Sequence, residues 1–379
     1  MSLFRKFLIR HPVLKSLSSI KITAVCLGLL FILTLWGTIA QIEQGLYNSQ
    51  HKFFYSWYFL AGGFIPFPGA QLVLWVLFIN LVCVSMTRFV YKWSHLGILI
   101  IHMGLLSYFV AAFVTFHVTQ ESNITLLEKE ATDVSSDYHQ WELSVWPDSE
   151  RPHRDVTAVD TEHLVPSKEI PFEDLEFTLT VKDYYSNAEA YTGMTEGKIE
   201  TVNQSGIRHL SVVDRNIEPE KNIPGGVFRI SDGTNDVDLM LYGAETQPNK
   251  IKMVGQGVNF QLRRKRYPLP FTLKLNDFDM EMHPGTTTAK SYKSHVEIEH
   301  HDISRDVLIW MNHPFHYKDF TLYQASYSVD SMGRQRSTLA VVKNAGRWLP
   351  YISSLMTFVG LAVHFLAMAF PKKKEINNA

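Results

Sequence analysis

The chain has 379 residues, a formal net charge of −1 and 46% hydrophobic residues, so its length allows two or three domains. It has no basic excess of the kind that nucleic-acid-binding proteins carry, and no nucleic acid is expected as a partner. The two cysteines, Cys26 and Cys83, exclude a disulfide framework, a Cys-x-x-Cys redox pair and a cysteine zinc site. Both lie in apolar runs, where buried free thiols are expected.

The average composition conceals two different parts. Residues 1–116 and 349–370 are strongly apolar, whereas residues 117–348 are polar and strand-like. The sequence therefore predicts an integral membrane protein with three N-terminal helices, a large extracytoplasmic β-rich domain over 117–348, a fourth helix over 349–370 and a short tail over 371–379.

The first apolar run spans residues 22–40 and follows a basic segment. It is longer than the usual core of a signal peptide, so an uncleaved membrane helix is expected. Thr38-Ile39-Ala40 resembles a weak cleavage site, which leaves a processed N-terminus as the alternative.

The segment 41–71 is rich in aromatic residues and is predicted to lie at the membrane surface, where amphipathic rings settle. A second helix is expected over about 70–88 and a third over about 94–116. Lys and Arg gather in 1–21, 88–92 and 371–375 but not in 41–71. The positive-inside rule then places both termini in the cytoplasm and the large domain outside the cytoplasmic membrane.

The third helix carries His95 and His102, seven residues apart and therefore on one helix face, ~10 Å apart. Imidazole is the commonest protein ligand of metals and haem iron. Gly97 and Gly104 leave a thin surface that a flat ligand or a neighbouring helix can approach. His364 of the fourth helix is expected within ~3 Å of the depth of His102, counting from the basic residues at the helix ends.

Structural interpretations of these polar residues stay open at this point. Each histidine can pack in a helix interface with a bond to a carbonyl or hydroxyl, and His95 lies where an interfacial side chain reaches the headgroups. Asn80 in the second helix is expected to form a hydrogen bond between helices.

In residues 117–348 the alternation of apolar and polar residues predicts short, mostly antiparallel strands, arranged as a sandwich or two small lobes. Pro219–Pro224 is a candidate linker between lobes. The predicted strands are 123–127, 141–146, 175–184, 227–230, 237–242, 271–278, 294–299, 320–328 and 337–342.

Two polar features of this domain invite functional interpretations. The histidines His295, His300, His301, His313 and His316 match no metal-site template, so solvated or structural roles are expected. The basic run 263–266 can contact anionic lipid or an acidic partner, but a solvated strand edge is the favoured interpretation.

Four segments together resemble the ResB family of cytochrome c biogenesis proteins, also called CcsB, over nearly the whole chain. They are Trp36–Phe54, Gly97–Leu105, Met311–Tyr327 and Gly346–Tyr351, in that order, with a large β-rich insertion before the last helix.

The resemblance implies a non-catalytic or accessory subunit of a complex that moves haem across the membrane and joins it to apocytochrome c. The implied partners are a haem-handling membrane protein of the CcsA or ResC type, apocytochrome c and a thioredoxin-like thiol reductant, besides membrane lipid. The implied cofactor is haem b, held transiently and shared with the partner subunit. His102 matches the family's transmembrane axial ligand best. His364 enters as a candidate only through the depth argument above, and His95 only through its spacing from His102, since the resemblance does not extend to its position.

Two rival interpretations remain. One is a membrane-anchored ligand-binding or sensing protein without haem, which leaves the intramembrane histidines unexplained. The other is a cytochrome b-like electron carrier that uses His95, His102 and His364; three histidines on two helices fall short of the four ligands that two haems need.

Overall fold

The computed structural model describes residues 11–88, 95–148, 155–193, 201–253, 255–286, 288–301, 303–330 and 332–370. The chain divides into two compact units. The helical unit comprises residues 1–120 and 343–379, and the β unit comprises residues 121–342. The predicted tail over 371–379, the start of the third helix at residue 94 and most of the basic segment 88–92 lie outside the described residues.

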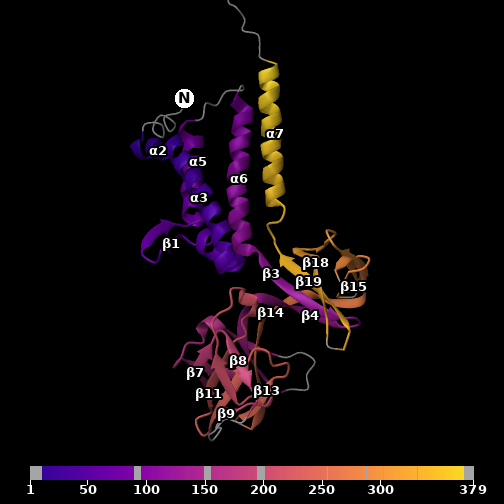
Figure 1. Ribbon diagram of the computed structural model, residues 1–379. Coiled ribbons are helices and arrows are strands. Elements are labelled where there is room, and N and C mark those ends of the chain that lie inside the picture. The colour runs from indigo at the N-terminus through magenta and orange to yellow at the C-terminus, as the bar shows by residue number, and fades with distance from the viewer. Residues whose placement is uncertain are drawn as a thin grey trace, which may run out of the picture. The chain divides into compact units, whose positions relative to one another are not determined.

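Four helices of the described chain are long and apolar enough to cross a membrane. Three precede the β unit in sequence and one follows it, and the β unit is mostly antiparallel. The predicted fold class is therefore confirmed. The four helices are α3 (Ile20–Gln44), α5 (Ala70–Thr87), α6 (Leu96–Val118) and α7 (Leu349–Ala369), and a short helix α2 (Pro12–Leu17) precedes them (Figure 1).

The aromatic segment between α3 and α5 folds back onto α3. It forms α4 (Leu46–Ser49), the π-helix η1 (Gln50–Phe54) and a hairpin of β1 (Tyr58–Ala61) and β2 (Ile65–Pro68). Phe53 is fully buried, and the Trp36 ring lies 5.5 Å from it and 5.5 Å from Phe59. Burial of these rings against α3 explains why so many aromatic residues occur in so short a segment.

Asn80 fastens α5 to the start of α3, as predicted. Its side-chain oxygen accepts from Thr23 Oγ1 at 2.7 Å, and its side-chain nitrogen donates to the carbonyls of Leu17 at 2.5 Å and Ser19 at 3.1 Å. The amide is 3% exposed and satisfied on both sides, so it costs little in an apolar surrounding. Cys26 and Cys83 are both buried and free, again as expected.

The β unit contains all nine predicted strands and several more. Its largest sheet has ten strands, with the central order β16-β15-β14-β4-β3-β19-β18-β17, β13 pairing with β14 and β5 with β4. A second sheet has the order β6-β7-β11-β12-β9. The bounds are β3 Gln120–Leu127, β4 Ala131–Pro147, β5 Thr157–Asp160, β6 Glu169–Phe172, β7 Phe177–Tyr185, β8 Ala188–Tyr191, β9 Thr201–Val202, β10 His209–Val212, β11 Gly225–Ser231, β12 Asp236–Tyr242, β13 Asn249–Met253, β14 Gln256–Met282, β15 Ala289–His300, β16 Ile303–Trp310, β17 Phe315–Tyr317, β18 Phe320–Val329 and β19 Gln335–Lys343.

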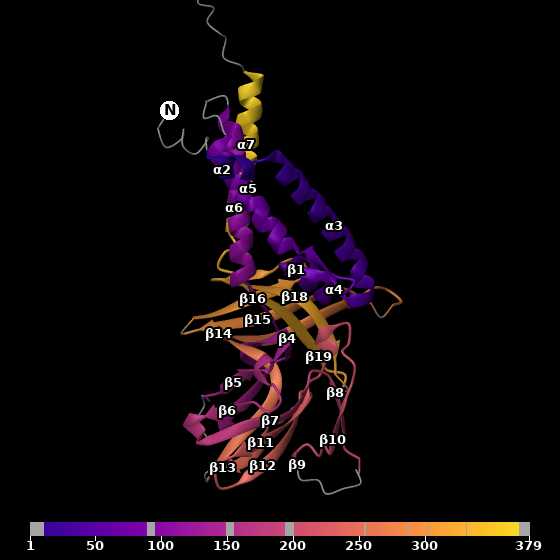
Figure 2. The same ribbon diagram turned by 90° about the vertical axis from the view of Figure 1, so that its left-hand side faces the viewer.

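Two hydrophobic cores divide the β unit into two lobes (Figure 2). In the first lobe the alternate apolar residues of β7, β11 and β12 pack against the first half of β14 and the second half of β4. In the second lobe β3, β15, β18 and β19 pack around the second half of β14. β14 is 27 residues long and β4 is 17, and both run through the two lobes.

The predicted linker between lobes is wrong. Pro219–Lys221 form a short 3-10 helix, η5, in the connection from β10 to β11. Both of these strands belong to the first lobe, since Leu210 of β10 packs in a cluster with Met240 of β12 and Phe228 of β11 lies in the core of the lobe. The lobes are joined instead by the strands that they share, β4 and β14. Charged residues interrupt the alternation of apolar and polar residues in these strands, so the sequence pattern did not predict their full length.

Candidate functional site

Helices α6 and α7 meet at backbone distance along a row of small residues (Figure 1). A Cβ atom on Gly97 would overlap the backbone of His364, and one on Gly104 would lie 2.9 Å from the Thr357 nitrogen. On the other helix, a Cβ atom on Gly360 would lie 2.7 Å from the Ile101 nitrogen. Such contacts are possible only because one partner of each pair is a glycine, which has no side chain to hold the backbones apart. Of the two roles open to the glycines of α6, the structure shows the packing of a neighbouring helix.

These contacts fix the register of the two antiparallel helices. Because residues 97 and 364, 101 and 360, and 104 and 357 face one another, His102 is level with Val359. His364 is then five residues away in depth, or ~7.5 Å, rather than the expected ~3 Å. The expectation failed because it counted from the helix ends, whereas the register is set by where the glycines let the backbones meet.

His102 lies on a different face of α6 from the α7 contact. At ~100° per residue it is ~140° around the helix from Gly97. Its Nδ1 lies 2.8 Å from the carbonyl oxygen of Ile98, one turn earlier. A carbonyl only accepts, so Nδ1 carries the proton and Nε2 carries the lone pair. This is the arrangement in which a histidine presents Nε2 to a metal while a carbonyl holds its ring.

The other two predicted site histidines have separate environments. His364 contacts Gly97 through its backbone, and its Nδ1 is buried without a hydrogen-bond partner among the described residues. His95 is the N-terminal capping residue of α6. The register places His364 within two residues of His95 in depth along the helix axis. His102 lies five residues from His364 in depth.

The face of α6 that bears His102 continues into an aromatic cavity. Phe109 and Phe116 follow His102 at intervals of seven residues and so share its face. Phe109 contacts Phe78 of α5 with ring centroids 5.6 Å apart. Between η1, α5 and α6 lies a cavity of about 520 Å³ whose lining includes Phe109, Phe116 and His117. Sequence reasoning missed this cavity because His117 lies at the end of its helix and η1 was expected only to rest at the membrane surface.

Most histidines of the β unit have structural contacts. His316 Nδ1 bonds Thr321 Oγ1 at 3.0 Å, and His313 stacks on Trp310 with ring centroids 4.1 Å apart. His300 Nδ1 bonds the carbonyl of Pro270, and Lys318 donates to its Nε2 at 3.0 Å. Both ring nitrogens of His300 are thus occupied.

One group of side chains has the composition of a cation site. Asp277, Asp279 and His295 bring their ligand atoms within 4.8 Å of one another on β14 and β15. However, Lys293 Nζ lies 3.4 Å from the Asp279 carboxylate and already supplies a positive charge there. These exposed groups are therefore sufficiently explained as an ion-paired strand surface.

The basic run 263–266 lies where β14 pairs with β4, and among the described residues the ladders with β13 and β15 do not include it. The predicted strand edge is therefore present on one side, but three of its four basic side chains are engaged by neighbouring groups. Arg263 donates to Glu142 at 2.9 Å and Lys265 to Asp160 at 2.8 Å. The Arg264 guanidinium lies 4.1 Å from the centre of the Trp141 ring, a cation–π contact. The positive charges of Arg263, Arg264 and Lys265 are thus engaged within the β unit, by a carboxylate and an aromatic ring of β4 and a carboxylate of β5.

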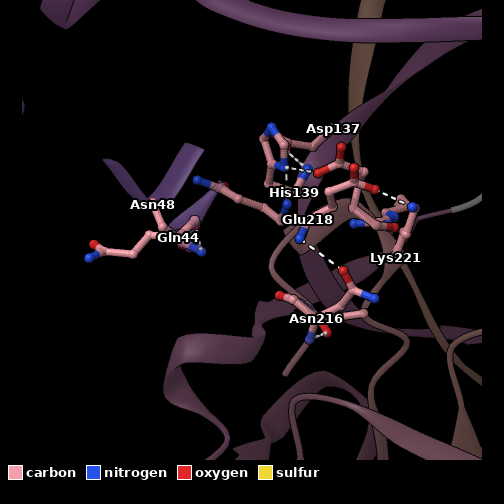
Figure 3. Close-up of polar contacts among 11 residues, drawn as sticks. Gln44, Asn48, Asp137, His139, Asn216, Glu218 and Lys221 are labelled. Carbon is pink, nitrogen blue, oxygen red and sulfur yellow. Dashed lines mark hydrogen bonds and ion pairs between the residues drawn. The ribbon is translucent and has the colours of Figure 1, made fainter. Parts of the chain in front are cut away.

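A polar cluster beside that run brings together Asp137 and His139 of β4 and residues of the loop before β11, among them Asn216, Glu218 and Lys221 (Figure 3). Asp137 accepts from the backbone nitrogen of His139 at 2.7 Å and from Tyr267 Oη at 2.9 Å. Burial, followed by the bond to Asp137, raises the pKa of Tyr267 well above its usual range. Burial lowers the pKa of His139, while Glu220 at 3.8 Å opposes that shift. The shifts follow from packing and mark no reactive group.

Comparison with known proteins gives two matches. Residues 239–335 match the model of the ResB-like family. This segment includes the whole of the third motif, Met311–Tyr327, and confirms the resemblance predicted from the sequence. A segment of 101 residues is 29% identical to Protein NrfI of Wolinella succinogenes and covers 26% of this chain. The chain matches only 11% of the length of that curated relative.

Proposed function

We propose that this chain is a subunit of a haem-handling complex for cytochrome c biogenesis in the cytoplasmic membrane. The ResB-like match and the four apolar helices support a membrane protein of cytochrome c biogenesis in general terms. The finer assignment is that haem is the cargo and that His102 is one of its axial ligands. The complementary ligand comes from a CcsA- or ResC-type partner subunit.

The observation that carries this proposal is the bond between His102 Nδ1 and the Ile98 carbonyl. It fixes the ring and leaves the lone pair on Nε2, which is the atom that binds haem iron in proteins. The site lies on an apolar helix face away from α7, where a porphyrin body is compatible with its surroundings. Haem supplies the iron and the vinyl groups that react with apocytochrome thiols, and this chain's residues hold and orient it.

The role of His364 follows from the helix register. At ~7.5 Å in depth from His102 and on the α7 side of α6, it is poorly placed to share the same iron. We assign His364 a supporting role, together with His95, at the N-terminal end of α6. Both remain candidates for contact with the haem propionates or the partner subunit.

The proposed topology places both termini in the cytoplasm and the β unit outside. The β unit then offers its surface to apocytochrome c or to the partner's outer loops. Cys26 and Cys83 are 4% and 5% exposed, so a thioredoxin-like partner, and not this chain, supplies reducing equivalents to the apocytochrome.

The test is a visible spectrum of the detergent-purified complex with and without His102→Ala. We expect a bis-imidazole haem spectrum in the unaltered complex and its loss in the variant, together with loss of mature c-type cytochromes. Leu105→Ala is the matched control, since Leu105 lies about one turn away on the same helix, is 39% exposed and has no atom that can bind iron. Normal cytochrome levels in His102→Ala would refute the ligand assignment, and absence of haem from every sample would favour a membrane-anchored binding protein.

A further inference from the structure

The cavity between η1, α5 and α6 has the shape and lining of a ligand site. Its volume of about 520 Å³ lies within the range of small-molecule and cofactor pockets. Eight of its fourteen lining residues are Phe, Tyr or Trp, and Gln71 and His117 are its other polar side chains. All of these belong to the helical unit.

The aromatic walls are held in place by ring contacts between elements. Trp75 of α5 contacts Phe113 of α6 with centroids 5.6 Å apart, and Tyr55 contacts Phe116 with centroids 5.0 Å apart. Trp75 also contacts Phe78 at 5.8 Å. Offset and edge-on contacts of this kind keep the rings in fixed orientations, so the cavity presents rigid flat faces.

The imidazole of His117 forms part of this wall. Its ring lies between those of Phe113, at 4.5 Å, and Phe116, at 5.1 Å. Among the described residues it has these ring contacts and no hydrogen bond. Its two nitrogen atoms are therefore not engaged by the described part of the chain, while its orientation is fixed by two neighbours on its own helix.

We propose that this cavity binds a second haem and that His117 is its axial ligand. A rigid aromatic cleft suits a flat apolar macrocycle, and an imidazole in the wall supplies the bond that iron requires. A lipid acyl chain would use the apolar walls but would not need the imidazole. The site rests on the proposed function only for the identity of its cargo.

The place of His117 on α6 connects the two sites. His102 and His117 are fifteen residues apart, or ~22 Å along the helix axis. They lie within ~60° of one another around α6, and the aromatic residues Phe109, Phe113 and Phe116 fill the interval on that side. Helix α6 therefore carries two imidazoles along one face, His102 nearer its N-terminal end and His117 near its C-terminal end. A path for haem along the helix would need this arrangement.

The experiment is a titration of the detergent-purified full-length chain with haem, followed by the Soret band and by quenching of tryptophan fluorescence. In the His102→Ala background we expect one haem to bind per chain, and at least a tenfold weaker affinity when His117→Ala is added. Val118→Ala is the matched control, since Val118 is the next residue, is 47% exposed and does not line the cavity. Added imidazole should restore part of the Soret band in the His117→Ala protein.

A second variant tests the cavity without touching the histidine. Ala112 lines the cavity, and Ala112→Phe should fill it and exclude haem while the thermal unfolding temperature stays within a few degrees. Equal haem affinity in the His117→Ala, Ala112→Phe and Val118→Ala proteins would overturn the proposal. So would competition by a short-chain quinone with no haem binding, which would make the cavity a quinone site.

The two proposals fail separately. If His117→Ala lowers the number of haems bound while His102→Ala binds as many as the unaltered chain, the His117 site stands and the assignment of His102 is wrong. If only His102→Ala loses haem, the proposed function stands and the His117 site does not exist.

Discussion

At the scale of single residues, Asn80 and His102 show how polar groups in the apolar helices find local partners. Asn80 satisfies its amide with a hydroxyl and two carbonyls, and His102 satisfies Nδ1 with the carbonyl of Ile98. The sequence predicted the role of Asn80, because an amide in an apolar helix has few alternatives to a bond with another helix. It could not predict the tautomer of His102, which depends on a rotamer.

Replacing Asn80 with leucine should therefore loosen the contact between α5 and the start of α3. We expect Asn80→Leu to lower the free energy of unfolding by about 1–2 kcal/mol, since three partner groups lose a bond. Thermal unfolding of the detergent-solubilised chain measures the effect. Thr34→Ala is the control and should change stability by less than ~0.5 kcal/mol, because the Thr34 hydroxyl bonds within its own helix.

Asp238 gives a second test at this scale, through pH. Its carboxylate accepts from Arg229 at 2.9 and 3.2 Å and from Lys182 at 2.6 Å. The bond from Arg229, with that from Lys182, holds the pKa of Asp238 below its ordinary value of 3.8. A depressed pKa stabilises the folded state at pH values above the unfolded pKa, and this contribution is lost as pH falls through the folded pKa.

We accordingly expect Asp238→Asn to lower the free energy of unfolding by about 1 kcal/mol at pH 7. The difference from the unaltered chain should shrink progressively once the pH falls below 3.8. Circular dichroism melts of both proteins across this range provide the measurement. A constant difference at every pH would show that the ion pairs carry no such linkage.

At the scale of elements, periodicity predicted which helices and strands exist. It did not predict how long the strands are or in which register the helices pack. Every predicted strand was found because alternating residues such as Leu339 and Val341 on β19 face a core. The length of β14 was missed because its middle carries a basic run whose charges are engaged by β4 and β5. The register of α6 and α7 was missed because it depends on glycines on both helices.

Because of that register, adding a single methyl group at Gly97 should destabilise the packing of α6 against α7. Gly97→Ala places a Cβ atom on the backbone of His364, so the helices must separate or shift. Overpacking of this kind costs about 1–3 kcal/mol, measured as lower thermal stability in detergent. Gly28→Ala is the matched control in α3, where a Cβ atom meets nothing within 4 Å, and it should be neutral or stabilising. Similar losses in both variants would contradict the proposed register.

At the scale of the whole molecule, composition alone separated the helical unit from the β unit. The contrast between apolar and polar segments reflects the different solvents in which two such units are stable. The aromatic cavity could not be predicted, because its walls come from η1, α5 and α6, and no local pattern reveals which distant rings meet. The charge pattern predicts the orientation in the membrane, which labelling can test.

Cysteine labelling of intact cells with a membrane-impermeant maleimide distinguishes the two possible orientations. We expect Ser205→Cys, in the exposed part of the β unit, to react at once, and Lys15→Cys, ahead of α3, to react only after permeabilisation. The unaltered chain is the control and should not react, since both natural cysteines are buried. Reaction of both variants from the same side would contradict the proposed topology.

The pairing of β3 with β19 imposes an order of events during synthesis. Thr125 on β3 bonds Thr338 on β19 at 2.9 Å across a separation of 213 residues. At about 5–20 residues per second a ribosome needs about 10–40 s to make that interval. Throughout this time the first strand of the β unit has an unpaired edge, and the second lobe is incomplete. The nascent chain is therefore vulnerable to aggregation and proteolysis until its last strand emerges, and a ribosome that stalls shortly before β19 leaves a product that cannot complete its sheet.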